Sequence, residues 1–264
     1  MLIKYIILGI IQGLTETLPV SSSGHLLIFR TLLNLNVDFD TIAILTNFGS
    51  LVAIVVLFWK DIVELISGFF KYLGGKKKEY KDKYNYCLLI VLGCIPAGIM
   101  GLVFSYFDVL DKISNNVKIV GVSLLVTSVM LFMVRNFKGK KLDNDITAKD
   151  ALIIGSFQIL GLLPGISRSG STIVGGMNRK LKRDTAFKYS FMLYIPLSIC
   201  ALILEVKDLI LDKALILHYS IAIFVSFIVT LLVTKWFRKV VNEGKLIYFS
   251  IYCLIVGLLV VLFL

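Results

Sequence analysis

Charged residues are scarce in this chain of 264 residues, and acidic ones are the scarcest, with 17 Asp and Glu against 28 Lys and Arg. Charged side chains make up only 17% of the sequence and apolar ones 58%, whereas soluble domains are about 25% charged and about 45–50% apolar. The mean hydropathy is +0.89. This balance argues against a soluble domain and predicts an all-α, polytopic integral membrane protein.

The chain also lacks the patterns of several other protein classes. Its four cysteines form no CxxC pair and have no metal-ligand spacing, so we interpret them as packing residues. The net charge is +11, but no basic face with interleaved aromatic residues accompanies it, and we expect no nucleic-acid partner. Residues 1–11 are apolar without a basic n-region or a small-residue cleavage site, so no cleavable signal peptide is expected.

Long apolar runs are what the chain has instead. A transmembrane helix needs about 20 apolar residues, and six runs are long enough. They are residues 41–59, 86–106, 117–134, 186–204, 215–236 and 246–264.

Two further apolar segments, residues 2–33 and 148–177, are interrupted by polar residues and helix breakers. They align without a gap at an offset of 146 residues. Identical pairs include Gly9 and Gly155, Gln12 and Gln158, Ser21 and Ser167, Ser23 and Ser169, and Gly24 and Gly170. Each arm has about 12 residues, half a membrane span, which predicts a re-entrant helical hairpin. Broken helices at matching places in two halves are typical of a polar site between inverted repeats.

The loop charges predict how the chain is threaded. Lys and Arg gather in the loops that follow the first, third and fifth spans and in the loop after the second broken segment. The loops at 34–40, 107–116 and 205–214 contain few. The positive-inside rule then places the basic loops in the cytoplasm and both termini outside. The result is one membrane domain of two inverted repeats, 1–136 and 147–264, each with one re-entrant hairpin and three transmembrane helices. An amphipathic interfacial helix is expected within the first basic loop, residues 60–85.

Ionisable residues within membrane segments usually mark function, and the residues expected at the depth of the hairpins include Glu16, His25 and Arg168. Ser-Arg-Ser-Gly before a helix start offers a guanidinium, hydroxyls and free N–H groups to an anion. Ser-Ser-Ser-Gly-His offers hydroxyls beside an imidazole, the groups of an activated nucleophile or an acid–base pair. Phosphate or pyrophosphate is the natural ligand of such a site.

At these residues the sequence resembles a known family. The stretch Gln12-Gly-Leu-Thr-Glu16-Thr-Leu-Pro-Val-Ser-Ser-Ser-Gly-His25 resembles the first signature of the bacterial undecaprenyl-pyrophosphate phosphatases, the bacitracin-resistance family: Glu or Gln, then xxxE, then PxSSxGH. Pro164-Gly-Ile-Ser-Arg-Ser-Gly-Ser-Thr172 resembles its second signature, PGxSRSGxT. The resemblance extends over the whole chain in length, repeat and motif order.

The resemblance implies a multi-pass enzyme of the bacterial plasma membrane. Its lipid substrate would be undecaprenyl pyrophosphate, whose terminal phosphate is removed to recycle the cell-wall lipid carrier. It also implies dependence on a divalent cation, Mg or Ca, and it leaves a homodimer open. By match to the motifs the catalytic residues are Glu16, Ser22, His25 and Arg168, with Glu16 also the metal ligand. The substrate-binding residues are expected to be Gln12, Ser21, Ser23, Ser167, Ser169, Gly170, Ser171 and Thr172. Gln12 departs from relatives that carry a second acid there.

The mechanism hypothesis places the pyrophosphate on Arg168 and on N–H groups of residues 169–172. The cation bridges Glu16 and phosphate oxygens. Ser22 attacks the terminal phosphorus with His25 as base or proton donor, although attack by His25 or by water stays open. Type-2 phosphatidic-acid phosphatases need a histidine soon after Ser-Arg, and none follows Arg168 until His218. The alternative is a lipid-phosphate flippase or secondary transporter, because such proteins share the inverted-repeat architecture.

Overall fold

The computed structural model describes residues 2–32, 39–75, 77–107, 109, 113, 116–209 and 211–264, and its elements are helices. The longer helices are α1 (Leu2–Thr15), α2 (Ser22–Leu32), α3 (Phe39–Leu57), α4 (Trp59–Gly75), α5 (Lys81–Tyr106), α7 (Val117–Val134), α8 (Ala148–Leu160), α9 (Arg168–Asn178), α10 (Arg183–Glu205), α11 (Ile216–Glu243) and α12 (Ile247–Phe263). The all-helical prediction is confirmed for these residues. Leu33, the end of the first predicted hairpin, and most of the loops at 34–40 and 107–116 lie outside them.

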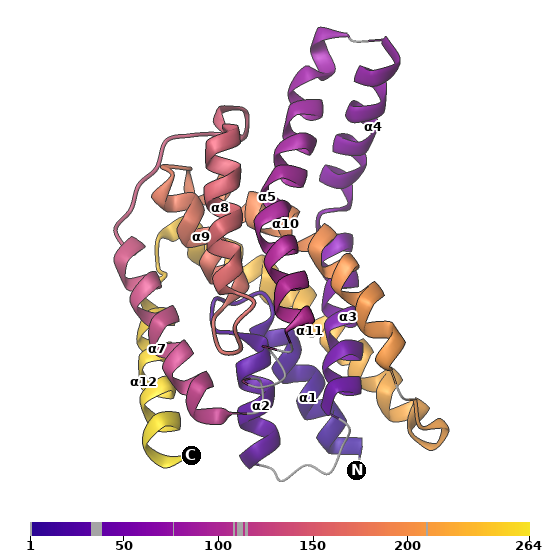
Figure 1. The fold of residues 1–264 in the computed structure, drawn as a ribbon, viewed down its shortest axis with the longest axis vertical. Coiled ribbons are helices and arrows are strands. Elements are labelled where there is room, and N and C mark those ends of the chain that lie inside the picture. Colours follow the sequence, from indigo (N-terminus) through magenta and orange to yellow (C-terminus); the bar gives the residue numbers. More distant parts are fainter. Residues whose placement is uncertain are drawn as a thin grey trace.

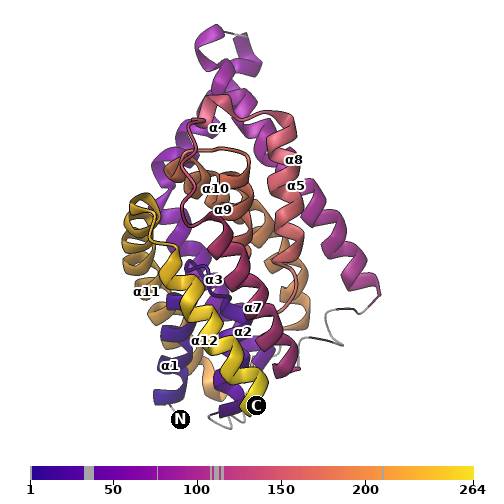
Figure 2. The same ribbon diagram turned by 90° about the vertical axis from the view of Figure 1, so that its left-hand side faces the viewer.

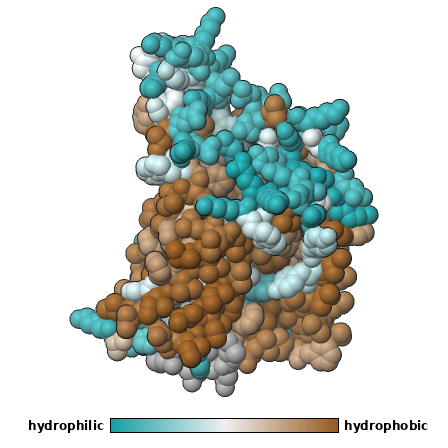
Figure 3. All heavy atoms as spheres, turned by 180° about the vertical axis from the view of Figure 1, so that it is seen from behind, coloured by the Kyte–Doolittle hydropathy of each residue, from teal (hydrophilic) through white to brown (hydrophobic). Residues whose placement is uncertain are grey.

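Five of these helices, α3, α5, α7, α10 and α11, are long and apolar enough to cross a membrane. The sixth predicted span corresponds to α12, which is apolar but has only 17 residues. Large apolar side chains on these helices are widely exposed, for example Leu102 at 62%, Leu232 at 66% and Leu262 at 70%. Figure 3 shows an apolar surface over the body of the molecule and hydrophilic side chains gathered at one end. An exposed apolar surface of this extent is expected of a protein surrounded by lipid.

Four helices are too short to cross a hydrocarbon core of about 30 Å at 1.5 Å per residue. They form two pairs. Helices α1 and α2 have 14 and 11 residues, and helices α8 and α9 have 13 and 11 residues. In Figure 1 the α1–α2 pair lies at the end of the molecule that carries both chain termini, and α8–α9 lies toward the other end. Each pair is joined by a turn, and the two turns meet in the middle of the molecule.

Helices from the first part of the chain pack closely on helices from the second part, namely α1 on α11, α5 on α8, α3 on α11 and α7 on α12. The matched glycines allow two of these contacts. A Cβ at Gly9 would lie 2.6 Å from the carbonyl oxygen of Ala222, and one at Gly155 would lie 2.1 Å from that of Gly93. Such close backbone approach is how membrane helices associate without a hydrophobic driving force.

Buried hydroxyls add hydrogen bonds between the same helices. Ser50 and Ser226 are 2.8 Å apart, and the Thr230 hydroxyl donates to Ser50 at 2.9 Å, joining α3 to α11. Ser128 and Ser250 join α7 to α12 through donation to each other's carbonyl oxygens, at 2.7 and 2.8 Å. These hydroxyls are therefore satisfied by structural contacts between helices.

Helix α4 and the first turns of α5 form a hairpin that projects beyond the rest of the molecule, as both ribbon views show (Figures 1 and 2). Glu64 pairs with Lys83 at 2.7 Å, and the rings of Phe69 and Tyr84 stack at 5.2 Å. The predicted amphipathic segment in the first basic loop is thus a helix. One of its faces lies on α5, while Trp59, Ile66 and Phe70 remain exposed.

The outer end of α8 is held by a buried acid, Asp150, which is 0% exposed. Its carboxylate accepts from Lys141 at 2.8 Å and from Arg179 at 2.7 Å, and it completes a capping box with Thr147. Burial opposes the charge on Asp150, but these donors outweigh it and lower its pKa. The network ties α8 to Lys141 in the loop before it and to Arg179, which follows α9.

Candidate active site

The first turn, between α1 and α2, is shaped by its helix breakers. The Thr15 hydroxyl donates to the carbonyl oxygen of Ile11 at 2.7 Å where α1 ends, and Pro19 follows. Ser21 then caps α2, because its hydroxyl accepts from the N–H of Gly24 at 3.3 Å. Its φ of 69° lies in the left-handed region, which costs a non-glycine residue about 1–2 kcal/mol. This strain lies directly beside the predicted nucleophile, Ser22.

The second turn, between α8 and α9, repeats the same cap. The Ser167 hydroxyl accepts from the N–H of Gly170 at 3.0 Å and lies 3.2 Å from the Ser169 hydroxyl. In the first turn the hydroxyls of Ser21 and Ser23 are 3.4 Å apart. The two turns touch, since the Ser169 hydroxyl donates to the carbonyl oxygen of Leu18 at 3.2 Å. The repeated serines therefore cap helices and join the turns.

Glu16, 9% exposed, is the centre of the polar cluster. One carboxylate oxygen accepts from the Gln12 amide at 2.9 Å and from the Ser22 hydroxyl at 2.5 Å. The other oxygen accepts from the Arg168 guanidinium at 2.7 Å. One acid and one guanidinium thus neutralise each other between the two turns. The cluster joins a hydroxyl, a carboxylate placed to accept its proton, and a guanidinium.

Arg168 is the first residue of α9 and reaches across to the first turn. Besides Glu16, its guanidinium donates to the Ser198 hydroxyl at 3.0 Å and lies 4.3 Å from the ring centroid of Tyr194. Its side chain keeps 25% exposure. The cation is therefore fixed on several sides while remaining accessible to a ligand.

His25 is buried, at 2% exposure, and its ring binds elsewhere. Its Nδ1 lies 2.8 Å from the Ser21 carbonyl oxygen, and its Nε2 lies 2.8 Å from the hydroxyl of Tyr252 on α12. A carbonyl can only accept, so Nδ1 carries the hydrogen, and in the neutral ring Nε2 accepts from Tyr252. The structure pairs Ser22 with Glu16, and the participation of His25 in the reaction stays a prediction.

Part of the predicted anion cradle is already occupied by the protein itself. The N–H groups of Gly170 and Ser171 donate to the side chain and carbonyl of Ser167. The Ser171 hydroxyl donates to the Ser167 carbonyl at 2.8 Å, and Thr172 bonds the backbone of α9 and the hydroxyl of Ser190. These groups stabilise the start of α9. That they also bind substrate stays a prediction.

The predicted cation has limited ligands. Within the described residues no group of three or more His, Cys, Asp or Glu side chains is placed to hold a metal ion. Glu16, Gln12 and Ser22 nevertheless supply carboxylate, amide and hydroxyl oxygens, the ligand type that Mg²⁺ and Ca²⁺ prefer. A magnesium ion commonly takes one or two carboxylates, several waters and substrate phosphates. The residues therefore fit a cation whose coordination the substrate completes.

Sequence reasoning missed Tyr194, Ser198 and Tyr252, because it treated their segments only as apolar spans. A signal existed for the first two. They are four residues apart in α10, so they share one helix face, and both are buried, at 6% and 3% exposure. For Tyr252 no local signal distinguishes it from an interfacial aromatic.

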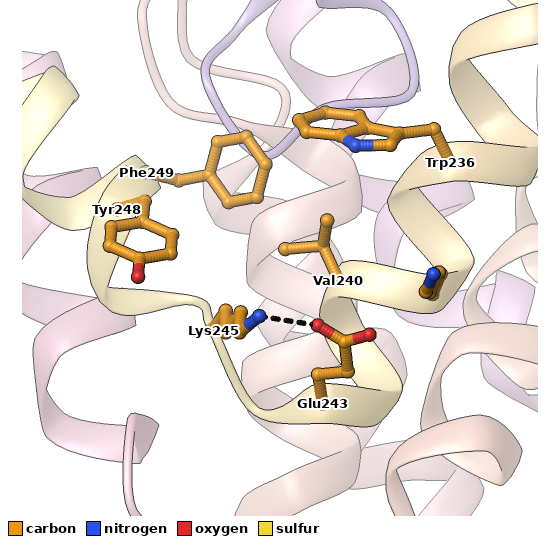
Figure 4. Close-up of a pocket in the computed structure, with 7 residues that line it drawn as sticks. Trp236, Val240, Glu243, Lys245, Tyr248 and Phe249 are labelled. Carbon is orange, nitrogen blue, oxygen red and sulfur yellow. Dashed lines mark ion pairs between the residues drawn. The ribbon is translucent and has the colours of Figure 1, made fainter.

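One surface pocket lies away from this cluster. It is formed where α11 ends and α12 begins and is lined by Trp236, Lys239, Val240, Glu243, Lys245, Tyr248 and Phe249. Figure 4 shows Glu243 and Lys245 paired across its edge, with the rings of Trp236 and Phe249 beside Val240. None of the predicted site residues lines it.

Comparison with known proteins identifies the family of this chain. The sequence model of the family described as "Bacitracin resistance protein BacA" matches residues 5–259. "Undecaprenyl-diphosphatase 2" of Bacillus thuringiensis is 41% identical over 100% of this chain and 98% of its own length. "Undecaprenyl-diphosphatase" of Oceanobacillus iheyensis is 38% identical over 100% and 97%. The chain therefore belongs to the bacitracin resistance protein BacA family.

Proposed function

We propose that this chain hydrolyses undecaprenyl pyrophosphate to undecaprenyl phosphate and inorganic phosphate, and so recycles the cell-wall lipid carrier and confers resistance to bacitracin. The observation that carries the proposal is the meeting of Ser22, Glu16 and Arg168 between the two helical turns. The names of its relatives point to the same reaction. The apolar helices fit a lipid substrate with a long isoprenyl chain.

The nucleophile in this proposal is the Ser22 hydroxyl. Its proton passes to Glu16, whose oxygen is 2.5 Å away, as the Ser22 oxygen attacks the terminal phosphorus. The bond between that phosphorus and the bridging oxygen breaks, so undecaprenyl phosphate leaves and a phosphoserine forms. Water then hydrolyses the phosphoserine, releases inorganic phosphate and restores the hydroxyl.

Arg168 stabilises the transferring phosphoryl group. Positioning and charge neutralisation supply most of the catalysis in phosphoryl transfer. To reach phosphate oxygens with its Nη2, Arg168 must release Glu16, so substrate binding exchanges one anion for another. The N–H groups at the start of α9, those of Arg168 and Ser169, add donors at the same place.

Glu16, with Gln12 and Ser22, would hold the divalent cation that the family resemblance implies. Such an ion neutralises phosphate charge when it is bound. The carboxylate oxygen that Arg168 releases is the one it would use. Because the remaining ligands come from substrate and water, cation and pyrophosphate should bind cooperatively.

The membrane arrangement in this proposal has two inverted repeats with re-entrant helix pairs. Support comes from the equal offset of the two turns, from the short helices at opposite ends and from the hydrophilic cap at the end away from the termini (Figures 1 and 3). The basic loops then lie in the cytoplasm and both termini outside. Both turns come from one chain, so a homodimer would not be needed to complete the site.

Phosphate release by purified protein in detergent tests the activity. The proposed enzyme turns over undecaprenyl pyrophosphate in the presence of Mg²⁺, and Ser22→Ala lowers the rate by at least ~100-fold. A transporter that moves the intact lipid releases no phosphate in detergent, and that result would reject the proposal.

Cysteine labelling of intact cells tests the topology separately. In a variant without native cysteines, Lys77→Cys should resist an impermeant thiol reagent until the membrane is opened. Ready labelling in intact cells would overturn the inside placement of the basic loops.

A further inference from the structure

We propose that Tyr194 and Ser198 of α10 are positioning residues that hold the Arg168 guanidinium in the orientation needed to receive the terminal phosphate. The inference rests on the proposed function, because it assigns Arg168 to the phosphate. It concerns how the arginine is kept in place when its present partner, Glu16, is exchanged for substrate.

The ring of Tyr194 supports the guanidinium from one side. The Cζ atom of Arg168 lies 4.3 Å from the ring centroid, well within the range of a cation–π contact. Tyr194 is only 6% exposed, so little water competes for the cation on this side. A guanidinium carries five N–H donors in a fixed fork, so it can hold this contact and still donate hydrogen bonds, which an ammonium group on a flexible stem cannot imitate.

Ser198 fixes the rotation of the guanidinium. Its buried hydroxyl accepts from Nη1 of Arg168 at 3.0 Å, while Nη2 donates to Glu16 at 2.7 Å. Two terminal nitrogens thus have different partners. Nη1 is bound to the scaffold, and Nη2 is bound to the carboxylate that substrate must displace. When Glu16 is released, the ring and the hydroxyl still hold the arginine with Nη2 directed at the site.

The platform itself is rigid. Tyr194 and Ser198 are one helical turn apart on the same face of α10, and the helix is buried over most of its first half. The Tyr194 hydroxyl makes a long hydrogen bond, 3.4 Å, to the Asn47 side chain on α3. The two residues therefore hold an arginine of α9 against a carboxylate of the α1–α2 turn from a third, fixed element.

Kinetics of matched variants test the inference. Tyr194→Leu removes the ring and should lower kcat about 30-fold, or about 2 kcal/mol at 1.36 kcal/mol per tenfold. Tyr194→Phe keeps the ring and should retain at least one third of the activity. Ser198→Ala should lower kcat about tenfold, and Ser198→Thr, which keeps a hydroxyl, should recover most of the loss. Tyr189→Phe is the control on the same helix, α10. The Tyr189 hydroxyl donates to the carbonyl oxygen of Leu89 on α5 at 2.6 Å, so this change removes a hydroxyl that does not contact Arg168.

A double-mutant cycle separates positioning from general stability. In an Arg168→Lys background, Tyr194→Leu and Ser198→Ala should each cost less than threefold, because no guanidinium is left to orient. Equal losses in both backgrounds would overturn the inference. So would a lowered melting temperature with a normal kcat in the folded fraction. If Tyr194→Leu does not fold, the Ser198→Ala and Ser198→Thr pair decides, because it changes so few atoms.

The wild-type protein is assayed first, so that a failure of the proposed function is recognised separately. If it releases no phosphate, the variants are compared by the rise in melting temperature that inorganic pyrophosphate produces. A rise in wild type and Tyr189→Phe that shrinks in Tyr194→Leu and Ser198→Ala supports the positioning role. Equal rises in all four proteins, or none in any, would reject it.

Discussion

The turn between α1 and α2 and the turn between α8 and α9 share their capping and packing residues, but one carries an acid and the other a guanidinium. Ser21 and Ser167 cap their helices in the same way, and Gly9 and Gly155 allow the same close packing. Other positions differ: Glu16 is matched by Leu162, Ser22 by Arg168 and His25 by Ser171. The repeated serines and glycines support the backbone, whereas the groups that react in the proposed mechanism, Glu16, Ser22 and Arg168, stand at positions that differ.

The identical pair Gln12 and Gln158 shows the same divergence. Gln12 donates to Glu16 at 2.9 Å, whereas both polar atoms of the buried Gln158 side chain have no partner among the described residues. Leu162 stands four residues after Gln158, where the first segment has Glu16, so the Gln158 amide has no acid to bind. The acidic half of the site and the cationic half have thus been separated between the turns. Four sets of substitutions can break or sharpen this comparison.

The largest effect is expected at position 16. Glu16→Gln should lower kcat by at least ~1000-fold, because one group both accepts the Ser22 proton and holds the cation, and each role alone is worth ~100-fold or more. Phosphate release at several Mg²⁺ concentrations measures it. Leu162→Gln at the matched position should stay within tenfold of wild type. Near-normal turnover of the Glu16 variant would place the acid elsewhere.

Arg168→Lys should lower turnover about 100-fold, roughly 3 kcal/mol, since lysine cannot bind a phosphate through two parallel donors. The melting temperature should change little because the charge remains. If Arg168 serves only as the ion-pair partner of Glu16, the variant will instead melt early and remain active where folded. Recording both quantities on one preparation distinguishes the roles.

Asp150→Asn should destabilise the protein without slowing the reaction. The loss should be on the order of 3 kcal/mol, because Lys141 and Arg179 lose a buried partner. Since the folded pKa of Asp150 is lowered, its contribution is present above the ordinary carboxyl range and disappears only in strong acid. The difference in melting temperature should therefore be constant from pH 6 to pH 8. The residue of α1 that matches Asp150 is Lys4, and Lys4→Gln should change the melting temperature little.

The smallest effects are expected at the two capping serines. Ser21 has a φ of 69°, so Ser21→Gly relieves strain and should leave stability unchanged or raise it by up to ~1 kcal/mol. Ser167 has a φ of −72°, so Ser167→Gly loses its cap without relief and should cost about 0.5–1 kcal/mol. We expect the melting temperature to stay the same or rise in Ser21→Gly and to fall in Ser167→Gly. Equal losses would show that the left-handed Ser21 is not strained.

The sequence allowed the helical class, the apolar helices and the two interrupted segments to be predicted, because composition, hydropathy and helix breakers are local properties. It also brought Glu16, Ser22 and Arg168 into one hypothesis. The partners within the site could not be predicted. Ser22 begins α2 and faces back to Glu16, whereas His25, one helical turn later, contacts Tyr252. Those choices depend on where α2 starts and on what α12 places beside it, which no single segment encodes.

The bond between Glu16 and Arg168 joins residues 152 positions apart, and this has a consequence for biosynthesis. At about 5–20 residues per second, the ribosome needs roughly 8–30 s to add the arginine after the glutamate. Until then the first turn has an acid without its partner, and a lone charge in a bilayer is costly. The newborn first half should therefore hold Glu16 in contact with water at the membrane surface. In the proposed mechanism, hydrolysis can begin only when the second turn brings Arg168 to Glu16.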